Sequence, residues 1–233
     1  MTQIVKLSNQ LPVCPGCDVT FTTKLSPGFR LRRLIIPGEI AEHFLLTSLA
    51  FGKNNQMMSP GAVPAILFSD NANPQSYDFD PNPENDEIKI SVTNQSDKTI
   101  MFVAAAFGDD SPDAKVNHTN FIGLGNTSVP SGQGANICVQ PAQKFQGRRL
   151  VVPSTIGSDF SITGIKVGHH DQFRDNTPPI PAFLFSETRV PETNDLNLDT
   201  CHESVFLTLS VLNTSRDTKN FSAALTGLFR DRE

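Results

Sequence analysis

The chain of 233 residues has no tryptophan and a single tyrosine, Tyr77. Aromatic side chains with a polar edge are the usual platform on which proteins stack sugars, so a carbohydrate-binding module would be poorly supplied with them. Charge is sparse as well, with 18% charged residues and a formal net charge of -5. The composition lacks the excess of lysine and arginine that binding to nucleic acid needs. We therefore expect no direct sequence-specific contact with nucleic acid.

Long apolar runs are also missing. A helix that crosses a bilayer needs about 18 or more consecutive apolar residues, so we expect no transmembrane segment. The N-terminal residues show no apolar core of a secretory signal, which predicts a chain that is not secreted by that route. Few charges are typical of a surface that lies in contacts between subunits.

Cysteine is scarce, and two of the four cysteines form a C-x-x-C motif, Cys14 and Cys17. Such a motif is half of a zinc site or a redox pair, but a structural zinc site needs about four ligands. Cys138 and Cys201 are isolated in the sequence. In a chain without an export signal we expect free thiols rather than disulfides. We interpret the motif as a Pro-Gly turn with two small thiols.

Sequence signatures of catalysis are absent: the chain has no G-x-S-x-G, no phosphate loop and no H-E-x-x-H. His169 and His170 are the remaining metal candidates beside Cys14 and Cys17. A two-domain cupin enzyme would hold its metal through a histidine pair, but neighbouring residues on a strand point to opposite faces. We expect no enzymatic activity, no cofactor and no essential metal.

What the chain does contain is a duplication, which indicates two domains, each with its own core. Residues 29–70 match residues 145–187, and residues 91–108 match residues 210–227 without a gap. The identical positions include Arg32, Arg33, Leu34, Pro37, Pro64, Ala65, Phe68 and Ser69, which recur as Arg148, Arg149, Leu150, Pro153, Pro181, Ala182, Phe185 and Ser186.

Both copies read as β-structure. Apolar residues alternate with polar ones in residues 88–92 and 207–211, and 17 prolines punctuate many short elements. The predicted fold class is all-β, with two tandem, internally duplicated antiparallel β-sandwich domains of jelly-roll type. We expect an N-terminal arm with the CPGC turn at 1–18, a first sandwich at 19–108, a linker at 109–134 and a second sandwich at 135–233.

Finer features also repeat. The alternation slips at Ser48 and again at Gly164, which predicts a β-bulge at each site. The apolar runs 63–68 and 180–185 are predicted strands, each entered through a proline. Asn94 and Asn213 are interpreted as hairpin-turn residues, because asparagine tolerates left-handed geometry.

Residues kept in both copies are most simply kept by the fold. The arginine pairs Arg32–Arg33 and Arg148–Arg149 are therefore expected to be architectural, with acidic partners in the neighbouring copy or subunit; a phosphate site is the alternative. The arm has no matching segment in the second copy, and we predict that it reaches a neighbouring subunit. Disorder or an extra strand in its own domain are the alternatives. Its apolar residues are Ile4, Val5 and Leu7.

The architecture inferred for residues 19–229 resembles the double jelly-roll capsid proteins of tailless viruses and phages. No specific motif carries the resemblance. It implies a homotrimer that forms a pseudo-hexagonal building block of a virion shell, assembled in the host cytoplasm with other virion proteins as further partners. A lectin- or spike-like binding module on a virion or cell surface is the alternative function, and a cupin-type metal enzyme is the third.

Overall fold

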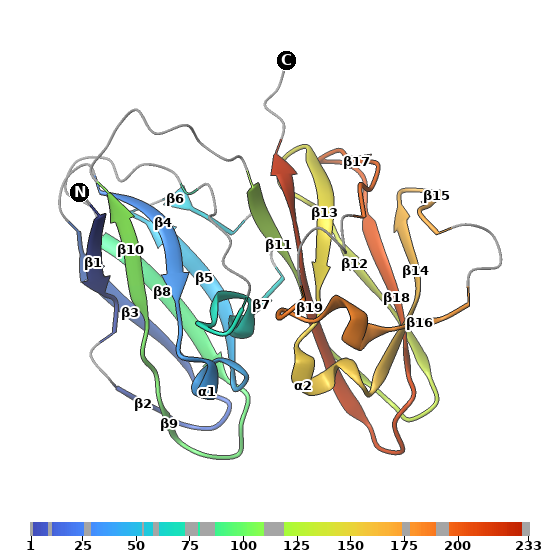
Figure 1. Ribbon diagram of the computed structural model, residues 1–233, viewed down its shortest axis with the longest axis horizontal. Coiled ribbons are helices and arrows are strands. Elements are labelled where there is room, and N and C mark those ends of the chain that lie inside the picture. Colours follow the sequence, from blue (N-terminus) through green and yellow to red (C-terminus); the bar gives the residue numbers. More distant parts are fainter. Residues whose placement is uncertain are drawn as a thin grey trace. The chain divides into compact units, whose positions relative to one another are not determined.

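The fold is all-β, and the described strands pair in antiparallel sheets (Figure 1). The chain divides into two units, of which the first comprises Met1–Met57 and Pro64–Asn120 and the second comprises Met58–Val63 and Phe121–Glu233. The computed structural model describes residues 2–8, 11–25, 29–52, 54–57, 61–72, 79, 87–109, 119–173, 178–189 and 196–229.

The first unit is a sandwich of two main sheets. One sheet has the order β1-β10-β4, and the other has the order β3-β8-β5-β6 with β7 paired to β5. β2 and β9 pair with each other in a separate two-stranded sheet. The strands are β1 (Thr2–Lys6), β2 (Pro12–Val13), β3 (Asp18–Lys24), β4 (Arg30–Ile35), β5 (Phe44–Phe51), β6 (Asn54–Asn55), β7 (Val63–Pro64), β8 (Glu87–Asn94), β9 (Ile100–Met101) and β10 (Ala105–Asp109).

The second unit is a sandwich with a corresponding arrangement. One sheet has the order β11-β19-β13-β17, and the other has the order β12-β18-β14-β15 with β16 paired to β14. The strands are β11 (Thr119–Val129), β12 (Gly134–Val139), β13 (Phe145–Val151), β14 (Phe160–Val167), β15 (His170–Asp171), β16 (Ile180–Pro181), β17 (Thr200–Cys201), β18 (Leu207–Asn213) and β19 (Lys219–Phe229).

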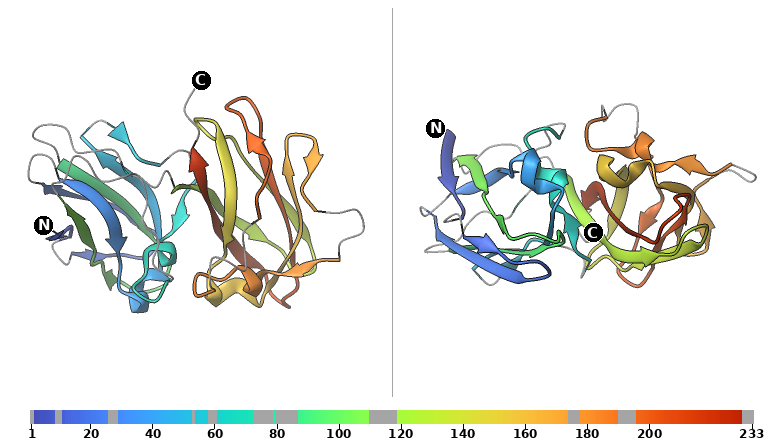
Figure 2. Two further views of the ribbon diagram at one scale, coloured as in Figure 1. Left: turned by 45° about the horizontal axis from the view of Figure 1, so that its top comes forward. Right: turned by 90° about the horizontal axis from the view of Figure 1, so that it is seen from below.

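One short α-helix and one turn of 3-10 helix lie at one end of each sandwich (Figure 2). In the first unit α1 (Gly38–Ala41) packs on η1 (Ala65–Phe68), and in the second unit α2 (Ser154–Gly157) packs on η2 (Ala182–Phe185). Each α-helix directly follows a proline, Pro37 or Pro153, whose missing N–H is no loss at a helix start.

Phenylalanine pairs lie in both cores at matching places. Phe44 meets Phe102 edge-to-face at a centroid distance of 5.0 Å, and Phe160 meets Phe221 in the same way at 5.0 Å. Phe160 belongs to one sheet and Phe221 to the other, so this pair joins the two layers. Each pair adds about 0.5–1.5 kcal/mol beyond the burial of its area.

The two predicted bulges are confirmed. The β5–β8 register shifts between Leu46 and Ser48, and the β14–β18 register shifts between Ile162 and Gly164. One extra residue lets the apolar side chains on either side of each shift face the same core.

The prediction of strands at 63–68 and 180–185 is wrong beyond the first two residues of each run. After β7 and β16 the chain turns into η1 and η2. An uninterrupted apolar run does not distinguish a buried strand from a buried helical turn, and in η1 all four side chains are buried.

The prediction of a linker at 109–134 is wrong for residues 119–129, which form the eleven-residue strand β11, and residues 110–118 lie outside the described part of the structure. Phe121 and Ile122 in this strand are fully buried. Glycine and asparagine are depleted in strands, so the composition of this segment did not indicate a strand. β11 lies next to β19 in its sheet, as β1 lies next to β10, so the arm has a structural counterpart in the second unit although no matching sequence marks it.

Candidate interaction surfaces

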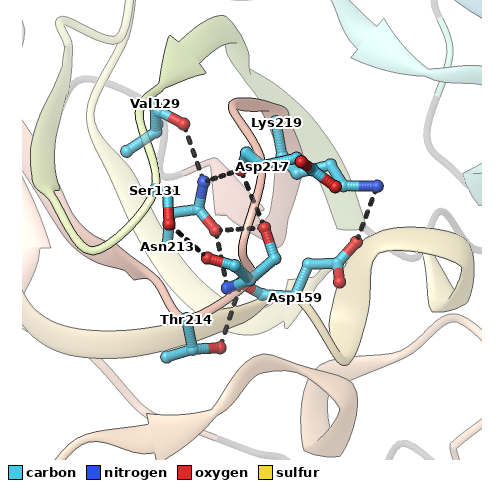
Figure 3. Close-up of polar contacts among 8 residues, drawn as sticks. Val129, Ser131, Asp159, Asn213, Thr214, Asp217 and Lys219 are labelled. Atoms are coloured by element: carbon cyan, nitrogen blue, oxygen red, sulfur yellow. Dashed lines mark hydrogen bonds and ion pairs between the residues drawn. The ribbon is translucent and has the colours of Figure 1, made fainter.

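The most complete polar network of the second unit surrounds Asn213 at the end of β18 (Figure 3). Its amide nitrogen donates to the carbonyl oxygens of Val129 at 2.7 Å and Asp217 at 2.9 Å. Its amide oxygen accepts the N–H of Ser215 at 2.9 Å and the hydroxyl of the same residue at 2.7 Å. The buried side chain therefore uses both of its donors and both acceptor positions, and it fixes the turn that leads into β19.

The same network secures the turn between β11 and β12. Gly132, with φ of 69°, donates its N–H to the carbonyl of Asn213 at 3.0 Å. The hydroxyl of Ser131 donates to the carbonyl of Ser215 at 2.7 Å. The carbonyl of Asp159 accepts the N–H of Thr214 at 2.8 Å, and the carboxylate of Asp159 lies 3.6 Å from Lys219.

Asn94 makes the corresponding hydrogen bonds in the first unit. Its amide nitrogen donates to Val13 at 2.8 Å and to Lys98 at 2.7 Å, and its oxygen accepts the N–H of Ser96 at 2.9 Å. Among the described residues other than glycine, only Asn197 has a positive φ, so the prediction of left-handed geometry at the two asparagines is wrong. Their role comes from the side-chain amide.

The CPGC motif forms the first unit's version of the turn, as interpreted: Cys17 donates its N–H to the carbonyl of Cys14 at 3.1 Å, and Gly16 has φ of 68°. The prediction of free thiols is wrong at these two positions, because Cys14 and Cys17 form a disulfide. The turn brings their Cα atoms to 5.3 Å, within the range of about 4.4–6.8 Å that a disulfide spans.

The other two cysteines are free thiols, as predicted. Cys138 is exposed on β12, and Cys201 is buried on β17. The thiol of Cys201 donates to the carbonyl of Val205 at 3.2 Å, and burial raises its pKa to about 11.

His169 and His170 are both exposed, at the hairpin between β14 and β15. Beside them, Lys166 and Asp171 form an ion pair at 3.9 Å. In the part of the chain that the structure describes, no three His, Cys, Asp or Glu side chains lie close enough to hold a metal ion.

The arginine pairs lie on β4 and β13, and the partners observed for Arg149 include backbone carbonyl oxygens. Arg149 is 4% exposed and donates to the carbonyl oxygens of Glu187 at 3.2 Å and Arg189 at 2.8 Å. The Glu187 carboxylate instead accepts the N–H of Ser154 at 2.8 Å, at the start of α2. The side chains of Arg32, Arg33 and Arg148 are half-buried.

The N-terminal arm is a strand of its own unit. β1 pairs along β10, with Ile4 opposite Phe107 and Val5 opposite Ala106. Leu7 is buried and donates its N–H to Ala104 at 2.9 Å. Of the alternatives for the arm, the extra strand is therefore the one observed, and β1 is the terminal strand of its sheet among the described strands.

The second unit exposes an apolar segment that we call the proline segment, residues 178–184. Within it only Ala182 is buried, and Phe183 and Leu184 are 43% and 39% exposed. The matching residues of the first repeat, Ile66 and Leu67, are 7% and 6% exposed. Sequence reasoning missed this surface, although the segment contains three prolines and no charged residue.

A groove of about 490 Å³ lies beside β11 and β12 in the second unit. Leu124, Ile137 and Val139 supply buried apolar side chains, and Phe206 at the rim is 53% exposed. The side chains of Asn136 and Gln140 add amide groups. β11 and β12 are terminal strands of their sheets within the described part of the structure.

None of the described helices has the length and hydrophobicity to cross a membrane. The chain matches no protein-family model and no curated protein sequence.

Proposed function

We propose that this protein is a structural subunit whose function is self-assembly, as the capsid protein of a viral or phage shell built from duplicated jelly-roll domains. The observation that carries the proposal is the exposed proline segment. Fully burying a phenylalanine or leucine side chain is worth about 1.5–3 kcal/mol, and Phe183 and Leu184 leave much of that unrealised in the single chain. A partner that covers these two side chains would gain the remaining free energy of burial.

The sheet edges support the same proposal. β1, β3, β11 and β12 are terminal strands of their sheets among the described elements. Open edges favour uncontrolled pairing between molecules, so proteins usually cover them or use them in specific contacts. A shell subunit uses such edges to contact its neighbours.

The duplication itself supports a shell. The two sandwiches have corresponding sheet orders, and each has the same asparagine network at the end of its central strand β8 or β18. A subunit with two similar halves presents two similar lateral faces. Three such subunits would offer roughly sixfold edges, from which closed shells can be tiled.

The test is the oligomeric state of the purified chain, measured by light scattering after size exclusion and by negative-stain electron microscopy. We expect trimers or closed particles. A protein that stays monomeric at high concentration, and that is missing from particles isolated from its source, would contradict the proposal.

A second candidate function rests on the groove at β11 and β12. An exposed phenylalanine beside amide side chains is the composition of a sugar-binding or peptide-binding site, which fits a spike- or lectin-like module on a virion or cell surface. Binding to a glycan array that is lost in Phe206→Ala would favour this candidate.

A further inference from the structure

We propose that Cys14 and Cys17 form a thiol–disulfide exchange site, which thiols reduce and disulfides reoxidise while the fold of the first unit stays the same. Its substrates are thiols and disulfides of the glutathione type. This activity goes beyond self-assembly and does not depend on it. The inference follows from comparing the CPGC turn with the corresponding turn of the second unit.

The disulfide closes a turn that backbone hydrogen bonds already hold. Cys17 donates its N–H to the carbonyl of Cys14 at 3.1 Å. Gly16 donates its N–H to the carbonyl of Asn94 at 2.8 Å, and Asn94 donates its own N–H to the carbonyl of Cys17 at 3.2 Å. Three bonds that involve no sulfur atom therefore fix the turn in itself and to the end of β8.

The second unit makes the same three bonds with no disulfide. Gln133 donates its N–H to the carbonyl of Pro130 at 3.1 Å. Gly132 donates to the carbonyl of Asn213 at 3.0 Å, and Asn213 donates to that of Gln133 at 2.9 Å. Gly132 and Gly16 also share a positive φ, of 69° and 68°. This backbone therefore forms without a bond between sulfur atoms, and the first unit should keep it after reduction.

A disulfide across this turn contributes little to stability. A crosslink acts mainly by restricting the unfolded chain, and its effect decreases as the closed loop becomes shorter. Pro15 and Gly16 alone separate Cys14 from Cys17. Structural support thus gives little reason for the disulfide, whereas C-x-x-C is the spacing of dithiols that exchange readily.

The two cysteines differ in accessibility. Cys14 is exposed, as are Pro15 and Gly16 next to it, whereas Cys17 is half-buried. Exchange requires a thiolate to reach one sulfur atom of the disulfide. Cys14 is therefore the residue that is attacked, and Cys17 is the residue that leaves and, in the reverse direction, resolves the mixed disulfide.

Reduction consumes two thiols. A glutathione thiolate attacks Sγ of Cys14, the bond between the two protein sulfur atoms breaks, and Cys17 leaves as a thiolate that takes from water the proton that glutathione gave up. A second glutathione thiolate attacks the glutathione sulfur of the mixed disulfide, which releases oxidised glutathione and the Cys14 thiolate, protonated in the same way. Two electrons thus pass to the protein. In reverse, Cys14 attacks oxidised glutathione, and Cys17 then attacks Sγ of Cys14.

The first experiment measures exchange in the folded full chain. Protein with Cys138→Ser, which removes the other exposed thiol, is incubated in mixtures of reduced and oxidised glutathione. Acid quenching, alkylation and mass spectrometry then give the reduced fraction of the pair. We expect reduction in excess reduced glutathione, reoxidation in oxidised glutathione, and circular dichroism spectra that coincide for the two forms. A pair that stays oxidised until denaturant is added, or a chain that unfolds on reduction, overturns the inference.

The second experiment separates the roles of the two cysteines. In the same background, reduced Cys17→Ser should retain glutathione on Cys14 after treatment with oxidised glutathione, because no second thiol resolves the mixed disulfide. Reduced Cys14→Ser should be modified more slowly, since Cys17 is half-buried. The intact pair should close its disulfide and retain no glutathione. Equal rates in the two single variants, or the opposite order, overturn the assignment of Cys14 as the attacked residue.

The third experiment transfers the site to the second unit. Pro130→Cys and Gln133→Cys are made in a chain whose native pair and Cys138 are replaced by serine. Because the two turns share their backbone bonds, the new pair should form a disulfide and exchange with glutathione in both directions. Failure of the folded variant to form this disulfide contradicts the inference that one backbone suits both redox states.

Discussion

The side-chain amide of Asn213 donates to the carbonyl of Val129 at 2.7 Å, and that of Asn94 donates to the carbonyl of Val13 at 2.8 Å. Each bond ties the end of a central strand to the chain just before a glycine turn. The turn differs between the units, as PSGQ in one and as a disulfide-closed CPGC in the other, while the asparagine is the same. The asparagine and its hydrogen bond are thus common to both units, whereas the residues of the turn differ.

Replacing Asn213 by alanine should destabilise the protein by about 2–4 kcal/mol. The change leaves two carbonyl oxygens and the N–H of Ser215 without their partner in a buried place. Chemical denaturation followed by circular dichroism measures the loss. Asn220→Ala is the control, because Asn220 is exposed, and it should change stability by less than about 0.5 kcal/mol. Equal effects of the two changes would show that the network contributes nothing.

The double substitution Cys14→Ser, Cys17→Ser should leave the fold intact and cost about 2 kcal/mol or less. The disulfide closes a very short loop, so it removes little entropy from the unfolded chain. The second unit also makes the equivalent turn without a disulfide, through the Gln133 N–H to the carbonyl of Pro130 at 3.1 Å. Denaturant titration with and without reductant checks the cost. Global unfolding on reduction would refute this expectation.

The two free thiols should differ in reactivity. At pH 8 an aromatic disulfide reagent should titrate one thiol in the folded, unreduced protein and two after unfolding, since Cys138 is exposed and Cys201 is buried. Cys138→Ser should abolish the reaction of the folded protein, whereas Cys201→Ser should not. Rapid reaction of Cys201 in the folded state would contradict its observed burial.

Stability should fall as the pH rises from about 9 toward 11. Burial raises the pKa of Cys201 from an ordinary value of 9.0 to about 11, so in this window the unfolded chain loses the proton and the folded chain keeps it. The unfolded state then binds fewer protons, and the free energy of unfolding decreases with pH. In Cys201→Ala this part of the alkaline decrease should disappear, as denaturation at pH 8 and pH 10.5 would show.

Gly123→Ala should loosen the attachment of residues 61–63 to the second unit. The added Cβ would lie 2.2 Å from the carbonyl oxygen of Gly61, where backbone rather than a flexible side chain must move. Hydrogen exchange should increase at residues 61–63. Gly164→Ala is the matched control on another strand, because its Cβ would meet only the side chain of Ser210, at 3.8 Å or more. Equal exchange in both variants would mean that the close approach is unimportant.

The sequence predicted those parts of the fold that its own repetition marks. The bulges at Ser48 and Gly164 were predictable because two copies kept the same slip in alternation. The strand β11 was not predictable in that way. Its residue Gly123 lies so close to Gly61 that a side chain would not fit, and no local sequence pattern indicates that contact. The composition of residues 119–129 indicated a loop, whereas tertiary contacts favour a strand in this segment.

The exposure of the proline segment could not be predicted from the sequence for a similar reason. Ile66–Leu67 and Phe183–Leu184 are apolar pairs at matching positions, and their sequences give no sign that one is buried and the other exposed. Burial depends on what each segment lies against. The role of Arg149 was partly predictable: recurrence pointed to architecture, but the carbonyl oxygens that it binds are set by the path of the chain after η2.

The buried amides also bear on N-linked glycosylation. Asn94-Gln95-Ser96 and Asn213-Thr214-Ser215 are acceptor sequences for N-linked glycans, which attach to the same amide nitrogen. Both hydrogens of that nitrogen are used in the folded chain, and both asparagines are fully buried. In a secretory compartment, glycan transfer to the unfolded chain would therefore compete directly with folding.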